Sequence, residues 1–296
     1  MSSQKSSPEG RRTPRVLVIV FSAGIDPWLT IEKQEQEGIL AELRTHFVDT
    51  LWFQGAPEIS ARYRYRFLNW LILQQLGLTY SEIPWLRKFV KRSWNRFEWN
   101  ALGSRYLKHM VRKRWTRPTS YTSDHRILQD LPIQLPLSGI RTLDALRYSI
   151  ENYEFDYLLR INSTCLPVPS QIAELVAKLP SERVYGGKTL QFAGTRFVSG
   201  AAIIFSRDVV RGIVDNAERY CYNVYEDVGI GRLIQSKNLA DLVEIQRLDI
   251  TAVAEIPEIA SPGWPGVYVV RCKVEAPDTT QSQPVIQLMH ALRGHL

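Results

Sequence analysis

Two adjacent carboxylates and a Ser-Gly pair are the residues of this sequence best suited to chemistry. Ser199 and Gly200 come just before a short apolar run, and Glu226 and Asp227 precede a helix-like segment. A glycine lets the backbone approach a ligand closely, and a well-placed carboxylate can take a proton from a reacting hydroxyl. We therefore consider Asp227 a candidate general base, with Glu226 beside it, and the Ser-Gly pair a candidate ligand contact.

Both features also have a structural explanation. Acidic residues in the first turn of a helix interact with its dipole by about 0.3–1 kcal/mol, which is reason enough for Glu226 and Asp227. Gly200 could instead be a glycine required only by close packing at the start of a strand. The residues alone favour the structural explanation of the carboxylate pair.

Alternating strands and helices must position these residues. Short apolar runs predict strands at Arg15–Ser22, Val48–Phe53, Leu131–Pro136, Phe155–Asn162, Arg183–Gly187, Ala201–Phe205 and Val243–Asp249. Helical spacing of apolar residues predicts helices at Thr30–Phe47, Gly139–Tyr153, Pro169–Leu179, Arg207–Cys221 and Val228–Gln235. This alternation predicts an α/β, Rossmann-like fold with a largely parallel sheet covered on both faces.

Composition narrows the class of protein. The 296 residues are 45% hydrophobic and 23% charged, as in an ordinary globular protein. Residues 1–14 contain no apolar run and predict a disordered tail. No stretch reaches about 18 apolar residues, so we expect no membrane-spanning helix. The three cysteines lack zinc-like spacing, which indicates free thiols in a reducing compartment and makes the cytoplasm the expected location.

The positive charge is concentrated in one segment. Residues 61–117 contain 14 Lys or Arg against two Glu, and five of the eight tryptophans. We interpret them as a basic helical insertion in an α/β domain formed by residues 15–60 and 118–296. Three explanations stay open: a helical subdomain with solvated charges, docking on the anionic inner face of a membrane, and nucleic-acid binding, which we do not expect.

An ordered set of motifs resembles a known family. The set is Asp156–Thr164, Tyr185–Gly187, Phe197–Gly200, Phe205–Asp208 and Glu226–Gly231. It resembles the β-1,3-glycosyltransferases and their fringe-like relatives, most of all an uncharacterised viral and bacterial branch. The likeness covers roughly Arg141 to Arg271 and excludes the basic segment. It implies the GT-A fold, a nucleotide-sugar donor (a UDP-sugar first), a glycan or lipid-linked acceptor, and inverting transfer.

The family's acidic Asp-x-Asp motif, which holds a divalent metal on the donor diphosphate, is replaced here. The matching positions are Asn162, Ser163 and Thr164. Neutral oxygens bind a hard cation much less well than carboxylates do. We therefore assign no metal ligand, and dependence on Mn²⁺ or Mg²⁺ becomes a question for experiment.

The resemblance also implies roles for individual residues. Asp227 would be the base that deprotonates the acceptor hydroxyl, and Glu226 would orient the sugar or the base. Guanidinium groups can neutralise a departing diphosphate, so Arg160 and the Arg271/Lys273 pair are candidates, against a strand-end salt bridge and a solvated strand edge. The full set of expected donor contacts is Arg160, Asn162, Ser163, Thr164, Gly187, Ser199, Gly200, Arg271 and Lys273.

Two other classes of function stay open on the sequence. The missing acidic motif is compatible with a catalytically silent GT-A-like binding module. The basic, Trp-rich segment is compatible with a nucleic-acid-binding protein, which is the less favoured of the two.

Overall fold

The structure is a computed structural model of the 296-residue chain. It describes residues 13–22, 47–55, 120–121, 126–129, 138–192, 194–221, 224–252, 255, 265–272 and 291. The predictions for residues 1–12, for the basic segment 61–117, for the strand at 131–136 and for Lys273 lie outside the described residues. So does the predicted helix at 30–47, apart from Phe47.

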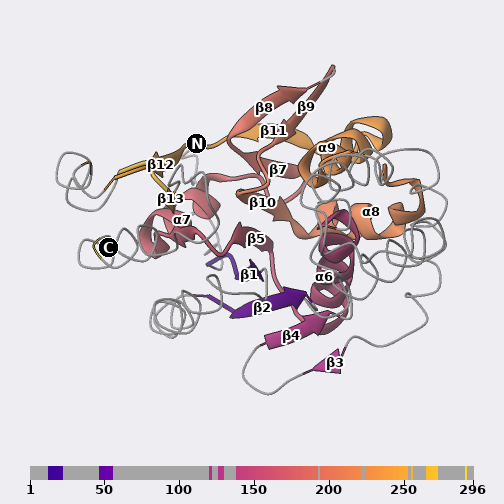
Figure 1. Cartoon of the computed structure of the whole chain (residues 1–296), viewed down its shortest axis with the longest axis horizontal. Coiled ribbons are helices and arrows are strands. Elements are labelled where there is room, and N and C mark those ends of the chain that lie inside the picture. The colour runs from indigo at the N-terminus through magenta and orange to yellow at the C-terminus, as the bar shows by residue number, and fades with distance from the viewer. Residues whose placement is uncertain are drawn as a thin grey trace, which may run out of the picture.

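An eight-stranded sheet forms the centre of the fold (Figure 1). Its strands, in spatial order, are β11 (Asp241–Glu244), β7 (Val184–Gly187), β10 (Ala202–Ser206), β5 (Tyr157–Asn162), β1 (Val16–Ser22), β2 (Asp49–Gly55), β4 (Arg126–Gln129) and β3 (Ser120–Tyr121). Four of the seven pairings are parallel; β10 runs antiparallel to both of its neighbours, and β3 to β4. The predicted α/β class with a mostly parallel sheet is confirmed.

Both faces of this sheet are buried, because its central strands are apolar throughout. Along β1, Val16, Val18 and Val20 face one hydrophobic cluster, whereas the alternate residues Leu17 and Ile19 face another. The second cluster is covered by α6 (Ser138–Asn152), α8 (Arg207–Asp215) and α9 (Glu226–Lys237). The first is covered by α7 (Pro169–Lys178) and a small second sheet, ordered β12 (Arg247–Ile250), β13 (Val269–Cys272) and β6 (Cys165–Pro167).

Three predicted elements differ from the structure. The single late strand at 243–249 is wrong: β11 pairs with β7 in the main sheet, and β12 pairs with β13 in the second. The helix predicted to continue to Cys221 ends at Asp215, and a 3-10 turn, Ala217–Arg219, follows it. The helix predicted from Val228 begins two residues earlier, at Glu226, so both carboxylates lie in its first turn.

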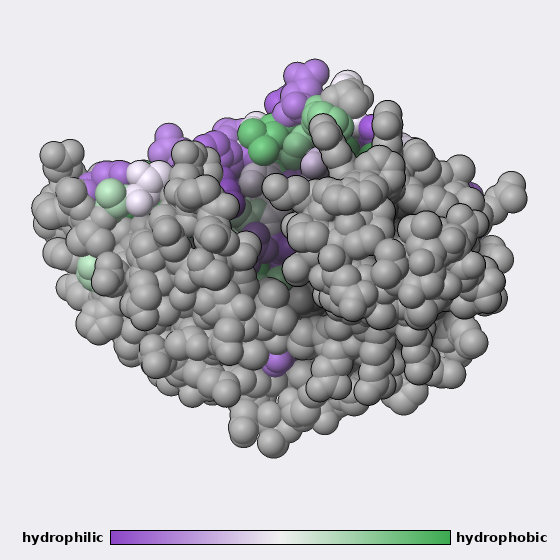
Figure 2. Space-filling view, viewed as in Figure 1, coloured by the Kyte–Doolittle hydropathy of each residue, from purple (hydrophilic) through white to green (hydrophobic). Residues whose placement is uncertain are grey.

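A two-stranded hairpin of β8 (Thr189–Phe192) and β9 (Thr195–Val198) projects from the main sheet (Figure 1). Its edge strand β8 carries Leu190 and Phe192, whose exposed fractions are 44% and 53%. Figure 2 shows hydrophobic surface at the top of the molecule, in the region of these strands. Strand β9 packs against α9, which connects the hairpin to the helix that carries the carboxylates.

The three cysteines form no disulfide. Burial raises the pKa of the Cys165 thiol, against the opposing charges of Arg247 and Arg271, and burial also raises the pKa of Cys272. These two thiols therefore stay protonated at neutral pH. In the part of the chain that the structure describes, no helix has the length and apolar character needed to cross a bilayer.

Candidate active site

The candidate residues gather at one edge of the main sheet. Strands β1 and β5 are parallel, and their carboxyl ends lie side by side, because Phe21 pairs with Asn162. Strand β10 runs the opposite way, so its first residue, Ala202, lies opposite Ile161 at the same edge. The carboxyl ends of β1 and β5 and the start of β10 therefore meet, which is where open α/β sheets bind ligands.

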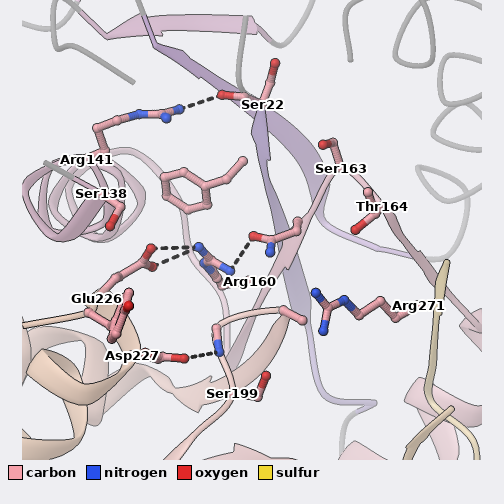
Figure 3. Close-up of a pocket in the computed structure, with 15 residues that line it drawn as sticks. Ser22, Ser138, Arg141, Arg160, Ser163, Thr164, Ser199, Glu226, Asp227 and Arg271 are labelled. Atoms are coloured by element: carbon pink, nitrogen blue, oxygen red, sulfur yellow. Dashed lines mark hydrogen bonds and ion pairs between the residues drawn. The ribbon is translucent and has the colours of Figure 1, made fainter. Parts of the chain in front are cut away.

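A cavity of about 600 Å³ opens at this edge. Its lining residues are Phe21, Ser22, Ser138, Arg141, Arg160, Asn162, Ser163, Thr164, Ser199, Gly200, Ala201, Tyr225, Glu226, Asp227 and Arg271. They come from the carboxyl-terminal parts of β1 and β5, from the turn after β5 and the loop before β10, from the starts of α6 and α9, and from β13 of the second sheet. Figure 3 shows them around the cavity. The cavity has the volume of a small-molecule site.

The first turn of α9 places the two carboxylates at the cavity. Tyr225 is extended (φ −56°, ψ 148°), and the helix starts at the next residue. Acidic side chains in this turn interact favourably with the helix dipole. At the other end, Asn238 adopts a left-handed conformation (φ 51°, ψ 45°) and terminates the helix. The helix therefore begins where both carboxylates of its first turn lie at the sheet edge.

Asp227 is held by backbone amides on both of its oxygens. Its Oδ2 accepts a hydrogen bond from the Gly200 amide at 3.0 Å (Figure 3). Its Oδ1 accepts one from Val228 N at 2.9 Å. A carboxylate has about four acceptor positions, so further donors can still bind. Asp227 is partly exposed and lines the cavity, so an incoming hydroxyl can reach it.

Glu226 is tied to the sheet and to α6. Its carboxylate lies 2.8 Å and 3.0 Å from Arg160 Nη2 and accepts a hydrogen bond from Thr142 Oγ1 at 2.5 Å. The two ion-pair side chains are only 4% and 11% exposed. Arg160 Nη1 donates to Asn162 Oδ1 at 2.7 Å, and its guanidinium lies over the Phe21 ring, 4.7 Å from the centroid. The salt bridge that the sequence left open for Arg160 is therefore the arrangement in the structure.

Of the three arginines among the described lining residues, Arg271 is the one whose side chain is free to bind a ligand. In Figure 3 its guanidinium points into the cavity from the side opposite Glu226 and Asp227. Among the residues that the structure describes, none forms a hydrogen bond or an ion pair with the Arg271 side chain, and its buried Nε has no partner. A buried polar group without a partner costs free energy, which an anion bound at this wall would offset.

Ser199 is anchored by the second sheet. Its Oγ accepts a hydrogen bond from Arg247 Nη1 at 3.0 Å, and Arg247 pairs with Asp249 through two contacts of 2.7 Å and 3.2 Å. Burial alone would raise the pKa of the Asp249 carboxyl, but the hydrogen bonds and charge of Arg247, with Lys188 and Arg271 nearby, outweigh it and hold that pKa below its ordinary value. Asp249 therefore stays ionised at neutral pH.

The structure brings nearly all of the expected site residues together. Those that line the cavity are Arg160, Asn162, Ser163, Thr164, Ser199, Gly200, Glu226, Asp227 and Arg271. Gly187 is not among them. A Cβ added there would lie 2.4 Å from Val198 Cγ1 and 2.7 Å from the Ala202 carbonyl, and its φ is 148°. Close packing accounts for this glycine without a ligand.

Sequence reasoning missed four residues that organise the site. Arg141 is buried and donates to the carbonyls of Ser22 and Phe53, at the ends of β1 and β2, at 2.7 Å and 3.0 Å. Thr142, Arg247 and Asp249 hold side chains of the site, as described above. Only Arg247 and Asp249 carried a signal: charges of opposite sign two residues apart on a strand share one face.

The residues at the altered Asp-x-Asp positions do not suit a divalent metal. Asn162 uses its side-chain oxygen to accept from Arg160, and Ser163 and Thr164 offer only neutral oxygens. Arg271 adds a positive charge to the same cavity. Within the described ranges, no group of three or more His, Cys, Asp or Glu side chains could hold a metal ion.

Comparisons with known proteins give structural likenesses only. No protein-family model matches the chain, and no curated protein matches its sequence. One similar structure is a glycosyltransferase involved in the glycosylation of the major capsid of PBCV-1 (TM-score 0.47, 7% identity, covering 94% of this chain and 100% of that one). Another is the galactosyltransferase LgtC with donor and acceptor sugar analogues (TM-score 0.40, 11% identity, covering 95% of this chain and 100% of that one). A third is the inositol-1-phosphate CTP transferase from T. maritima (TM-score 0.41, 8% identity, covering 96% of this chain and 98% of that one). Likenesses this remote do not transfer an activity.

Proposed function

We propose that this chain is a glycosyltransferase of the GT-A type, in the β-1,3-glycosyltransferase and fringe-like group. It moves a sugar from a nucleotide-sugar donor, a UDP-sugar first, to a hydroxyl of a glycan or lipid-linked acceptor, with inversion. The observation that carries the proposal is that the cavity has a positive charge on one wall and a negative charge on the facing wall. Arg271, whose guanidinium has no partner among the described residues, forms one wall. Asp227, a carboxylate held by backbone amides, lies across from it (Figure 3).

These two opposite charges are complementary to the charges that develop on the two reactants during sugar transfer. The acceptor oxygen attacks the anomeric carbon while its proton passes to an oxygen of Asp227. The bond from that carbon to the phosphate oxygen breaks, and the nucleoside diphosphate leaves with the electron pair. Arg271 binds the negative charge that gathers on the diphosphate, since guanidinium groups contact phosphate oxygens in pairs. The carboxylate and the cation thus serve opposite ends of one displacement.

The remaining residues support these two groups. Glu226 orients the base, because its ion pair with Arg160 fixes the first turn of α9 against β5. The hydroxyls of Ser163 and Thr164 and the amide of Asn162 line the cavity and offer hydrogen bonds to the donor. The basic segment 61–117 stays a prediction: contact with an anionic membrane surface would suit a lipid-linked acceptor.

Removal of the Arg271 guanidinium should weaken donor binding. A hydrogen bond to a charged group contributes about 1.5–3 kcal/mol, so we expect Arg271→Met to raise the dissociation constant for UDP about 10- to 100-fold. Isothermal titration calorimetry would measure it. Arg196→Met is the matched control, because Arg196 is exposed on β9 and does not line the cavity. Equal affinity of wild type and Arg271→Met would remove Arg271 from the donor site.

Transfer should not depend on a divalent cation. The described residues at the sheet edge contribute neutral oxygens and a guanidinium in place of paired carboxylates. We therefore expect that each nucleotide sugar of a panel will react at the same initial rate with EDTA present as with manganese added. A rate abolished by EDTA and restored by manganese would refute metal independence, although it would leave glycosyl transfer itself intact.

A further inference from the structure

The loop from Ser199 to Ala201 links the two sides of the cavity, and its Gly200 amide is one of the two that hold Asp227. The Ala201 carbonyl accepts a hydrogen bond from the Asn162 amide at 3.0 Å, on the side of the expected donor contacts. The Gly200 amide donates to Asp227 Oδ2 at 3.0 Å, on the side of the base. The direction of that one amide therefore depends on how the loop is held.

Ser199 fixes the loop through both its backbone and its side chain. Its amide donates to the Lys188 carbonyl at 2.9 Å, and its carbonyl accepts from the Ala202 amide at 3.3 Å. Its buried hydroxyl accepts from Arg247 Nη1 at 3.0 Å. Of these three contacts, the hydroxyl contact is the one that reaches the second sheet.

Arg247 is itself rigidly held. Its side chain is 3% exposed and makes a two-point contact with Asp249, through Nε at 2.7 Å and Nη2 at 3.2 Å. The Lys188 ammonium lies 3.6 Å from the same carboxylate. A buried guanidinium is tolerated only when it is paired, and a two-point contact also restricts its orientation. The pairing with Asp249 therefore directs the remaining Nη1 group at Ser199.

We propose that Arg247, held by Asp249, is a positioning residue for the base: through the Ser199 hydroxyl it sets the Gly200 amide that orients the Asp227 carboxylate. This inference rests on the proposed function in assigning Asp227 as the base. It adds a chain of contacts from the second sheet to the reacting group. Any change that frees the Ser199 hydroxyl should disorder one of the two amide contacts to Asp227.

The test is Ser199→Ala, which removes one hydroxyl and leaves the backbone intact. Hydrogen exchange of the Gly200 amide, followed by NMR on the full chain, should become faster. Loss of one hydrogen bond in the positioning of the base should lower kcat about tenfold, with the donor KM unchanged. Ser199→Thr retains a hydroxyl and should keep both the slow exchange and most of kcat. Arg247→Met should reproduce the alanine variant.

Ser206→Ala is the matched control. Ser206 is a fully buried serine whose hydroxyl accepts a hydrogen bond from the Val184 amide and donates one to Asp208 Oδ1, and it lies at the opposite end of β10. It should lose stability and leave Gly200 exchange and kcat unchanged. Unchanged Gly200 exchange or unchanged kcat in folded Ser199→Ala overturns the proposal. Because the exchange measurement needs no substrate, it decides the contact even if no sugar transfer is found.

Discussion

Asp227→Asn should lower kcat for sugar transfer about 10²- to 10⁴-fold, the contribution of a well-placed general base. The amide has nearly the shape of the carboxylate, but it cannot take the proton of the acceptor hydroxyl. The Gly200 and Val228 amides now bonded to the two carboxylate oxygens would lose one acceptor at most. We expect a folded protein that binds the donor nucleotide normally and transfers sugar poorly. Initial-rate kinetics with the donor that proves active, together with UDP titration, would measure both.

The control for this variant is Asp208→Asn. Asp208 is the second residue of α8, just as Asp227 is the second residue of α9, and it also accepts hydrogen bonds, from the Arg183 amide and the Ser206 hydroxyl. It lies at the far end of β10 and does not line the cavity. If Asp227 has only a helix-dipole role, the two variants will lose similar stability and neither will lose activity. Full transfer by Asp227→Asn would exclude it as the base.

The sequence predicted elements where a local pattern was sufficient. Strands β1 and β5 are apolar runs, and α6 repeats its apolar residues at helical spacing. The presence and the type of these three elements could therefore be predicted. The sheet that a strand joins could not be predicted from its local sequence. Nothing between Glu244 and Arg247 marks the change from the main sheet to the second one, because no Gly or Pro interrupts that stretch. The predicted single strand was wrong for this reason.

The same limit applies to the site. Ser199, Gly200 and the two carboxylates could be found because their residue types suggest chemistry. Their partners could not, since Arg160 and Glu226 are 66 residues apart, and Ser199 and Arg247 are 48 apart. Whether Arg160 holds a phosphate or a protein carboxylate depends on which of them the fold brings within reach. That question separates Arg160 from Arg271, and it can be tested directly.

Arg160→Met should lower the free energy of unfolding by about 3–5 kcal/mol, because it leaves the Glu226 carboxylate buried without its partner. Combining it with Glu226→Gln should recover much of that loss, since the buried charge is then also removed. Urea denaturation of the two single variants and the double variant would give the coupling free energy. Arg147→Met is the control: its pair with Glu151 at 2.7 Å is exposed, and such pairs contribute only about 0.3–0.5 kcal/mol.

The nucleotide affinity of the same variant assigns the role of Arg160. If Arg160 anchors the first turn of α9 while Arg271 binds the diphosphate, Arg160→Met studied well below its unfolding transition should bind UDP much better than Arg271→Met does. A stable Arg160→Met protein that no longer binds UDP would reverse the assignment. The buried ion pair would then be the resting state of a phosphate ligand, and Glu226 would be the group that the donor displaces from the guanidinium.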